Sequence, residues 1–184
     1  VGRWKGYGGE TNFNNRTFES LTWAAGLAAL TNYSTIFSTV HAPLMHPVAV
    51  AKMSATIDHI SNGRFALNVV AGWFKNEFEM FDAELKEHAA RYAYAAEWIE
   101  VIKRLWVEEE PFDYDGAYFR GNALWSQPKP IQLPRPPIMN AGSSTMGQKF
   151  SAQYADMNFV MLRQEDDDSD AVQIERLKSL AADR

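Results

Sequence analysis

The segment 63–78, GRFALNVVAGWFKNEF, constrains the fold most strongly. Residues 65–71 are apolar except for Asn68, and a run rich in valine and phenylalanine without polar alternation predicts a strand buried on both faces, as in a parallel sheet. An unpaired buried amide costs about 1 to 3 kcal/mol, so Asn68 must bond either another protein group or a ligand. Gly72 and Trp73 end the strand. Glu77 is expected in a loop or short turn just past its carboxyl end, where α/β folds bind ligands.

Helical and extended patterns alternate along the rest of the chain. Thr17 is expected to cap the first helix, Pro47 to begin the second, and Asn62 and Gly63 to end it. Repeated βα units with right-handed crossovers permit either a doubly wound sheet or a (β/α)8 barrel, of which four strands are about half. The expected elements are helices over 17–30, 46–61, 88–106 and 147–154, a final helix after the acidic run 165–170, and strands over 33–40, 65–71, 137–142 and 158–162.

Composition predicts a single α/β domain over residues 1–184. Nearly half of the 184 residues are apolar and 13% are aromatic, which is enough material for one buried core. Segment 111–137 holds most of the prolines together with several aromatic residues, and we expect an extended insertion or hairpin there. Because the chain opens on Val1 and its last residues continue a helical pattern, we also expect a fragment of a longer protein.

Several function classes are excluded or disfavoured by composition. The absence of cysteine rules out disulfides, zinc thiolate sites and a cysteine nucleophile within these residues. A net charge of −5 argues against a nucleic-acid partner. No apolar run approaches the roughly 18 residues of a membrane span, and residues 1–10 lack a signal-peptide pattern, so a cytoplasmic protein is expected. The histidines show neither HxH nor HExxH spacing, which predicts that there is no metal site.

Two segments carry residues suited to phosphate. Ser143 and Ser144 lie between an expected strand and helix, where hydroxyl groups and free backbone N–H groups can bind an anion, although helix capping alone would explain them. Arg91 and Tyr92 begin the long helix and could supply a bidentate cation and a hydroxyl donor. A surface pair between this arginine and a glutamate is the other interpretation.

Two further candidates concern acid–base chemistry. His41 directly follows an expected strand, where a group that titrates near neutral pH could face a substrate and act in catalysis; a surface or hydrogen-bonded loop histidine is the alternative. Glu77 and Glu79, close to Trp73, suggest the paired carboxylates of a glycosidase, but the sequence does not fix their separation.

Several separated blocks resemble the bacterial luciferase-like flavin monooxygenases, in the same order along the chain. The blocks are 51–64 (AKMSATIDHISNGR), 68–73 (NVVAGW), 87–92 (EHAARY), and 141–144 (AGSS) with 150–156 (FSAQYAD). Within that family the chain is most similar to the group of alkanesulfonate, dimethylsulfone and pyrimidine monooxygenases. The resemblance implies a (β/α)8 TIM barrel, present here as about half a barrel without its first βα unit and last strands.

The resemblance also implies reduced FMN as the cofactor and assigns residues to it. Asn68 would bond the flavin ring system, and Glu77 would lie near the flavin or its ribityl chain. Arg91, Tyr92 and Ser144, with Ser143 beside it, would hold the ribityl and phosphate end.

The implied activity is that of a two-component monooxygenase. A separate NAD(P)H-dependent flavin reductase would deliver FMNH2, O2 would add at the flavin C4a, and the peroxide would oxidise a small sulfonate, sulfone or pyrimidine-like substrate. A homo-oligomer, dimer or tetramer, is expected. The alternatives are a deazaflavin-dependent hydride-transfer enzyme, a barrel that binds flavin without catalysis, and a carbohydrate-active barrel.

Overall fold

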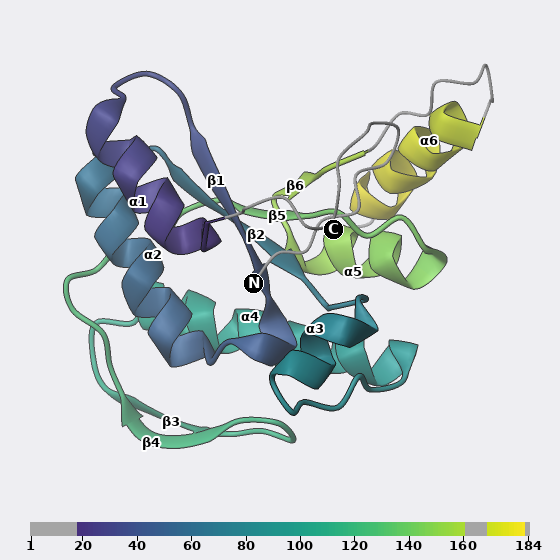
Figure 1. The fold of residues 1–184 in the computed structure, drawn as a ribbon, viewed down its shortest axis with the longest axis horizontal. Coiled ribbons are helices and arrows are strands. Elements are labelled where there is room, and N and C mark those ends of the chain that lie inside the picture. Colours follow the sequence, from purple (N-terminus) through teal and green to yellow (C-terminus); the bar gives the residue numbers. More distant parts are fainter. Residues whose placement is uncertain (1–17, 161–168, 183–184) are drawn as a thin grey trace.

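The computed structural model describes residues 18–160 and 169–182, and its centre is a parallel sheet (Figure 1). Four strands are hydrogen-bonded in the order β1-β2-β5-β6, and each neighbouring pair runs parallel. The strands are β1 (Ile36–His41), β2 (Phe65–Val70), β5 (Ile138–Asn140) and β6 (Met157–Asn158). The sequence therefore predicted the buried strand around Asn68 correctly.

The main helices form a continuous layer along the sheet. Helices α1, α2, α4 and α5 contact one another in that order and pack against the strands (Figure 1). Two short helices, η1 and α3, follow β1 and β2, and α6 contacts α5. The helices are α1 (Ser20–Leu30), η1 (Ala42–Leu44), α2 (Pro47–Ser61), α3 (Lys75–Met80), α4 (His88–Val107), α5 (Thr145–Tyr154) and α6 (Ser169–Ala182).

Strand alternation decides which residues enter the core between sheet and helices. Val40 on β1 and Leu67 and Val69 on β2 are at most 2% exposed and belong to one apolar cluster with Trp98 and Ile102 of α4. Since successive side chains of a strand point to opposite faces, the residues between them project from the other face. That second face carries the candidate site.

The boundaries of α2 follow the predicted signals. Pro47 takes the first helical position, and His46 Nδ1 accepts a hydrogen bond from the Val48 N–H at 3.3 Å. Asn62 adopts a left-handed conformation with φ 55°, and Gly63 follows with φ 78°. The prediction of this helix and of its left-handed C-cap is confirmed.

Three expectations need correction or lie outside the described residues. Thr17 is not described, and the observed cap of α1 is Glu19, whose carboxylate accepts bonds from the N–H groups of residues 21 and 22. Strand β6 starts one residue earlier than expected and ends at Asn158, so the predicted strand was wrong at residues 159 and 160; residues 161 and 162 are not described. The acidic run 165–168 also lies outside, whereas the final helix is present as α6.

Segment 111–137 contains an antiparallel hairpin of β3 (Phe112–Asp115) and β4 (Arg120–Leu124). The Glu97 side chain of α4 fixes the hairpin turn by accepting hydrogen bonds from the N–H groups of residues 117, 118 and 119 at 2.7 to 3.1 Å.

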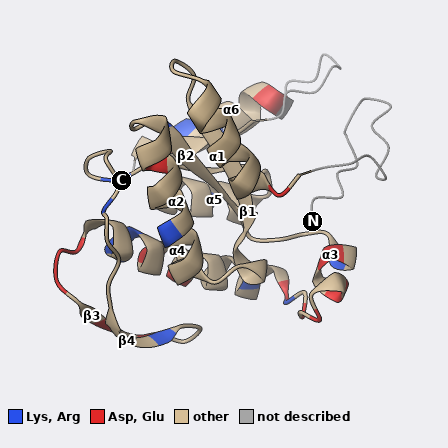
Figure 2. Ribbon diagram, turned by 60° about the vertical axis from the view of Figure 1, so that its left-hand side comes forward, with Lys and Arg blue, Asp and Glu red and all other residues tan. Residues whose placement is uncertain are grey.

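Acidic residues gather on α3 and on the segment that leads from α4 into β3, while Lys and Arg are scattered (Figure 2).

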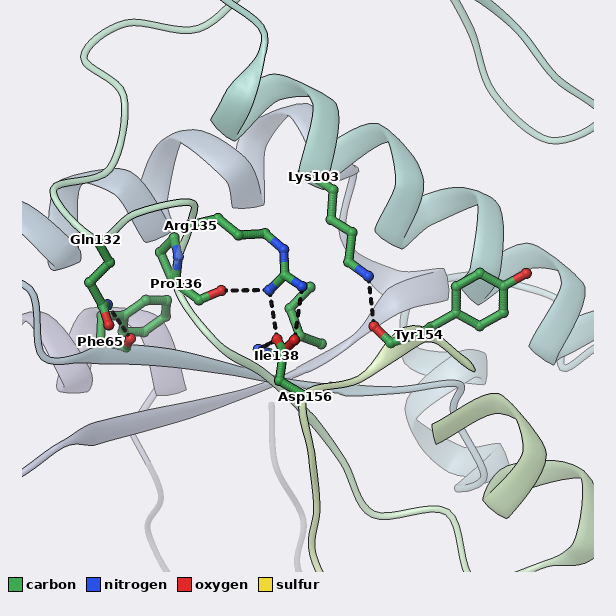
Figure 3. Close-up of polar contacts among 8 residues, drawn as sticks. All are labelled: Phe65, Lys103, Gln132, Arg135, Pro136, Ile138, Tyr154 and Asp156. Atoms are coloured by element: carbon green, nitrogen blue, oxygen red, sulfur yellow. Dashed lines mark hydrogen bonds and ion pairs between the residues drawn. The ribbon is translucent and has the colours of Figure 1, made fainter. Parts of the chain in front are cut away.

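Polar contacts lock the amino ends of β5 and β6 (Figure 3). The Arg135 guanidinium makes two hydrogen bonds to the Asp156 carboxylate, at 2.6 and 2.9 Å. Asp156 Oδ2 also accepts the Ile138 N–H at 2.8 Å, and Lys103 Nζ donates to the Tyr154 carbonyl at 2.8 Å. Partial burial acts to raise the pKa of Asp156, but the bonds from Arg135 and Ile138 outweigh it and hold that pKa below its ordinary value.

Candidate functional site

The strand register brings polar side chains together on the sheet face opposite the helices. Thr39 of β1 lies beside Asn68 of β2, which in turn lies beside Met139 of β5. His41 is paired with Val70, one row closer to the carboxyl ends of the strands. Rows on one face are about 7 Å apart along a strand, so His41 and Asn68 can contact the same ligand.

Asn68 is bonded on one side only. Its Nδ2 donates to Thr39 Oγ1 at 3.0 Å, which supplies the protein partner that a buried amide needs. Its Oδ1 is buried and accepts no hydrogen bond from any described residue. The sequence left a protein partner and a ligand as alternatives; the amide nitrogen has a protein partner, and the oxygen has none among the described residues.

His41 and Glu77 form a close pair between the end of β1 and helix α3. His41 Nδ1 lies 2.7 Å from Glu77 Oε2, and the two side chains are 22% and 3% exposed. Burial lowers the pKa of His41 below its ordinary value, and the Glu77 carboxylate opposes this shift without cancelling it. His41 is therefore a neutral imidazole near pH 7. It is the last residue of strand β1, one residue earlier than the loop position expected from the sequence, and its half-buried side chain lies within ion-pair distance of Glu77.

The turn after β2 explains why Glu77 points inward. Gly72 has φ 87°, and a Cβ at this position would come within 2.5 Å of the Phe78 ring, so the chain reverses closely over that ring. Helix α3 then buries Phe78 and Glu77, while Glu79 remains exposed and pairs with Lys75 at 3.4 Å. The predicted loop or short turn is thus a short helix, and its two glutamates face different directions, which argues against a glycosidase pair.

Arg91 lies at the start of α4 and bonds to the turn after β2. Its Nη1 donates to the Gly72 carbonyl, and its Nε is buried without a partner among the described residues. No described glutamate pairs with it, so the alternative of a surface Arg–Glu pair was wrong. The free Nε is a buried donor beside the carboxyl end of β2.

Ser144 caps α5 next to the start of α4. Its Oγ accepts the Gly147 N–H at 3.1 Å and lies 3.5 Å from His88 Nε2, and the His88 ring packs edge-on against Tyr92. Capping by Ser144, one of the two interpretations, is therefore confirmed, and it does not exclude anion binding at the same helix end. Ser143 is exposed just before it.

The structure brings the site residues predicted from the sequence together at one end of the sheet, where its strands end. His41, Asn68 and Glu77 lie around the carboxyl ends of β1 and β2, and the other four lie around the starts of α4 and α5. Sequence reasoning missed Thr39, whose alternation with the buried Val40 could have indicated it. It also missed His88 and Gly147, which only the contact between α4 and α5 reveals.

The polar groups of the site that have no partner among the described residues are of the kinds that could bind the parts of a flavin mononucleotide. Asn68 Oδ1 is an unused acceptor for a ring N–H, and Arg91 Nε is an unused buried donor. The hydroxyls of Ser143 and Ser144 adjoin the free N–H groups of a helix N-terminus, which suit a phosphate. The described residues contain no group of three metal-ligating side chains, and none of the helices built from them could cross a membrane.

The sequence model of the luciferase-like monooxygenase family matches residues 6–184. The chain belongs to this family. A pyrimidine monooxygenase RutA from Methylobacterium radiotolerans is 43% identical over 162 residues, which are 85% of this chain and 41% of the relative. The chain thus spans less than half the length of that curated relative.

Solved structures show the luciferase-like fold. A riboflavin lyase crystallised with modified FMN and riboflavin has a TM-score of 0.83 and 24% identity, covering 93% of this chain and 42% of the lyase. An F420-dependent tetrahydromethanopterin reductase from Methanopyrus kandleri has a TM-score of 0.76 and 18% identity, covering 90% and 50%. The predicted fold class, a luciferase-like α/β barrel of which about half is present, is confirmed.

Proposed function

We propose that the full-length protein is a flavin-dependent monooxygenase that uses reduced FMN and O2 to oxidise a small organic substrate. The observation that carries this proposal is the buried, unpaired Oδ1 of Asn68 on the sheet face opposite the helices. The 43% identical relative named as a pyrimidine monooxygenase supports a pyrimidine-like substrate over a sulfonate or sulfone.

In this proposal the described residues bind and orient the two ligands. Asn68 Oδ1 would accept a hydrogen bond from the flavin ring, and Ser143, Ser144, Arg91 and Tyr92 would hold its ribityl and phosphate end. When bound, reduced FMN supplies the activation of O2. His41 lies on the same face as Asn68 and would contact the substrate; Glu77, which the resemblance placed near the flavin, lies 2.7 Å from His41 Nδ1.

The test uses the full-length protein with chemically reduced FMN, O2 and one candidate at a time: uracil, an alkanesulfonate or dimethylsulfone. We expect substrate-dependent O2 consumption and incorporation of one labelled oxygen atom into a pyrimidine product. Addition of NAD(P)H and a separate flavin reductase should sustain turnover, and sizing would test the expected dimer or tetramer. Failure of FMN binding together with absence of labelled product from every candidate would refute the proposal.

The fold neighbour that depends on F420 favours a second candidate, a hydride-transfer enzyme that uses a deazaflavin at the same barrel end. Such an enzyme would oxidise or reduce its substrate without consuming O2. Turnover with F420 under anaerobic conditions, without oxygen incorporation, would replace the first proposal by this one.

A further inference from the structure

One row of residues crosses the whole sheet through Asn68. On one side Asn68 pairs with Thr39 of β1, and on the other side it pairs with Met139 of β5. Met139 in turn pairs with Met157 of β6. Neighbouring strands lie about 4.8 Å apart, so Met139 is one strand spacing from Asn68 and Met157 is two. Two thioether side chains therefore continue the row that contains the unpaired Oδ1 of the candidate site.

The packing of β5 shows to which face Met139 points. Ile138, the preceding residue, pairs with Leu67 of β2, and both side chains are 0% exposed in the core between sheet and helices. Successive side chains of a strand point to opposite faces, so Met139 projects from the face opposite the helices. Asn68 follows Leu67 and projects from that same face. The Met139 side chain is half-buried there.

The same reasoning places Met157. The next residue, Asn158, points to the helix layer, because its Nδ2 donates to Ser151 Oγ of α5 at 2.8 Å. Met157 therefore points to the other face, and it is 39% exposed. The two methionines lie side by side on the face that would receive the flavin.

Thioethers at this position are suited to react with an oxidant. The chain has no cysteine, so methionine provides its sulfur atoms. When reduced FMN reacts with O2 in the absence of a substrate, FMN is oxidised by two electrons and O2 is reduced to hydrogen peroxide. Hydrogen peroxide oxidises a thioether to a sulfoxide: the O–O bond breaks, an S–O bond forms, sulfur loses two electrons, and the second oxygen leaves as water with both protons.

We propose that Met139 and Met157 form an oxidation site of the full-length protein, at which hydrogen peroxide produced without substrate converts the thioethers to methionine sulfoxide. The proposal rests on the proposed function, because reaction of reduced FMN with O2 supplies the oxidant. A sulfoxide at Met139 adds a polar acceptor next to Asn68 Oδ1, so flavin binding weakens by about tenfold and peroxide production slows. Since methionine sulfoxide reductases restore the thioether, the change is reversible.

The first experiment uses Met53 as a matched control. Met53 of α2 is 43% exposed, close to the 39% of Met157, but it lies in the helix layer on the other face of the sheet. Full-length protein is mixed with FMNH2, O2 and catalase without substrate, and its peptides are analysed by mass spectrometry for one added oxygen atom. Met139 and Met157 should be oxidised about tenfold faster than Met53, because the oxidant forms beside them and catalase removes what escapes. Equal rates at the three methionines would overturn the proposal.

The second experiment measures the effect of the sulfoxide. After the same treatment, wild-type protein should bind FMNH2 about tenfold more weakly than its untreated sample, and methionine sulfoxide reductase should restore the affinity. Met139→Leu conserves apolar volume and removes the sulfur, so its affinity should not change on treatment. Met53→Leu should lose affinity as the wild type does. A loss in Met139→Leu as large as in the wild type would refute the role of this sulfur.

The outcomes separate the oxidation site from the proposed function. If the untreated protein neither binds FMNH2 nor consumes O2, both proposals fail. If it binds FMNH2 and incorporates oxygen into a substrate, but forms sulfoxide no faster at Met139 and Met157 than at Met53, only the oxidation site is rejected. Circular dichroism of each variant must match the wild type, and Met139→Ile provides a second variant without sulfur.

Discussion

Replacement of Asn68 by leucine should leave the unliganded protein stable and weaken flavin binding. The variant loses the 3.0 Å bond from Nδ2 to Thr39, which is worth about 0.5 to 1.5 kcal/mol, and Thr39 is exposed enough for water to replace it. It also removes the buried unpaired Oδ1, whose desolvation costs about 1 to 3 kcal/mol. These contributions oppose each other, so the free energy of unfolding should stay near the wild-type value or rise.

The affinity for flavin, in contrast, should fall in the Asn68→Leu variant. The bound flavin would lose one neutral hydrogen bond, about 0.5 to 1.5 kcal/mol, and an unpaired ring N–H would add about 1 to 3 kcal/mol, so affinity should fall by roughly tenfold to a thousandfold. Urea unfolding of the apo-protein and anaerobic fluorescence titration with FMNH2, both on full-length protein, measure the two quantities.

Asn140 provides the contrasting variant. Both of its amide atoms bond inside the protein: Nδ2 donates to the Val69 carbonyl at 2.7 Å and Oδ1 accepts the Gly142 N–H at 2.8 Å. Asn140→Leu removes the partners of a buried carbonyl, that of Val69, and of a half-buried N–H, that of Gly142, and should cost about 2 to 4 kcal/mol of stability. If Asn68→Leu behaves like Asn140→Leu, with lower stability and unchanged intrinsic FMNH2 affinity, then Asn68 is a structural amide and the reasoning fails.

Two further predictions concern stability. Gly147→Ala should lower the free energy of unfolding by about 1 to 3 kcal/mol, because its Cβ would lie 2.6 Å from the Tyr92 hydroxyl. Gly26→Ala should raise it by about 0.5 to 1 kcal/mol, because nothing lies within 4 Å of the added Cβ, and thermal melts that rank the two variants the other way would contradict the close packing at Gly147. Because the pKa of Asp156 is lowered in the folded protein, the ionised carboxylate stabilises the fold fully above the pKa of an unfolded aspartate, about 3.9, and this stabilisation is lost as the pH falls through the folded pKa. Arg135→Gln should therefore reduce the fall in the free energy of unfolding at acid pH. Identical curves of stability against pH for the variant and the wild type would refute the role of the ion pair.

Local sequence signals predicted the elements that carry the site. The unbroken apolar run around Asn68 identified β2, and proline at 47 with asparagine at 62 bounded α2, because these signals act through neighbouring backbone geometry. The contacts within the site were not predictable in the same way. The contact between His41 and Glu77 joins the last residue of β1 to helix α3, which follows β2, and no local pattern specifies that packing.

The partners of two other candidate residues, Arg91 and Asn68, were also determined by tertiary packing. Arg91 was expected either at a phosphate or in a surface pair with glutamate, yet it bonds the carbonyl of Gly72 across the turn after β2. Asn68 was recognised as an amide in need of a partner, but the division of its two atoms between Thr39 and an open position required the strand register. Sequence thus identified candidate residues, and tertiary packing determined their partners within the protein.

An anaerobic titration of the full-length protein with FMNH2, oxidised FMN and F420 tests the central claim most directly. The proposed monooxygenase should bind FMNH2 most tightly and should lose that preference in Asn68→Leu. Tighter binding of F420 than of FMNH2, or no binding of any flavin, would contradict it.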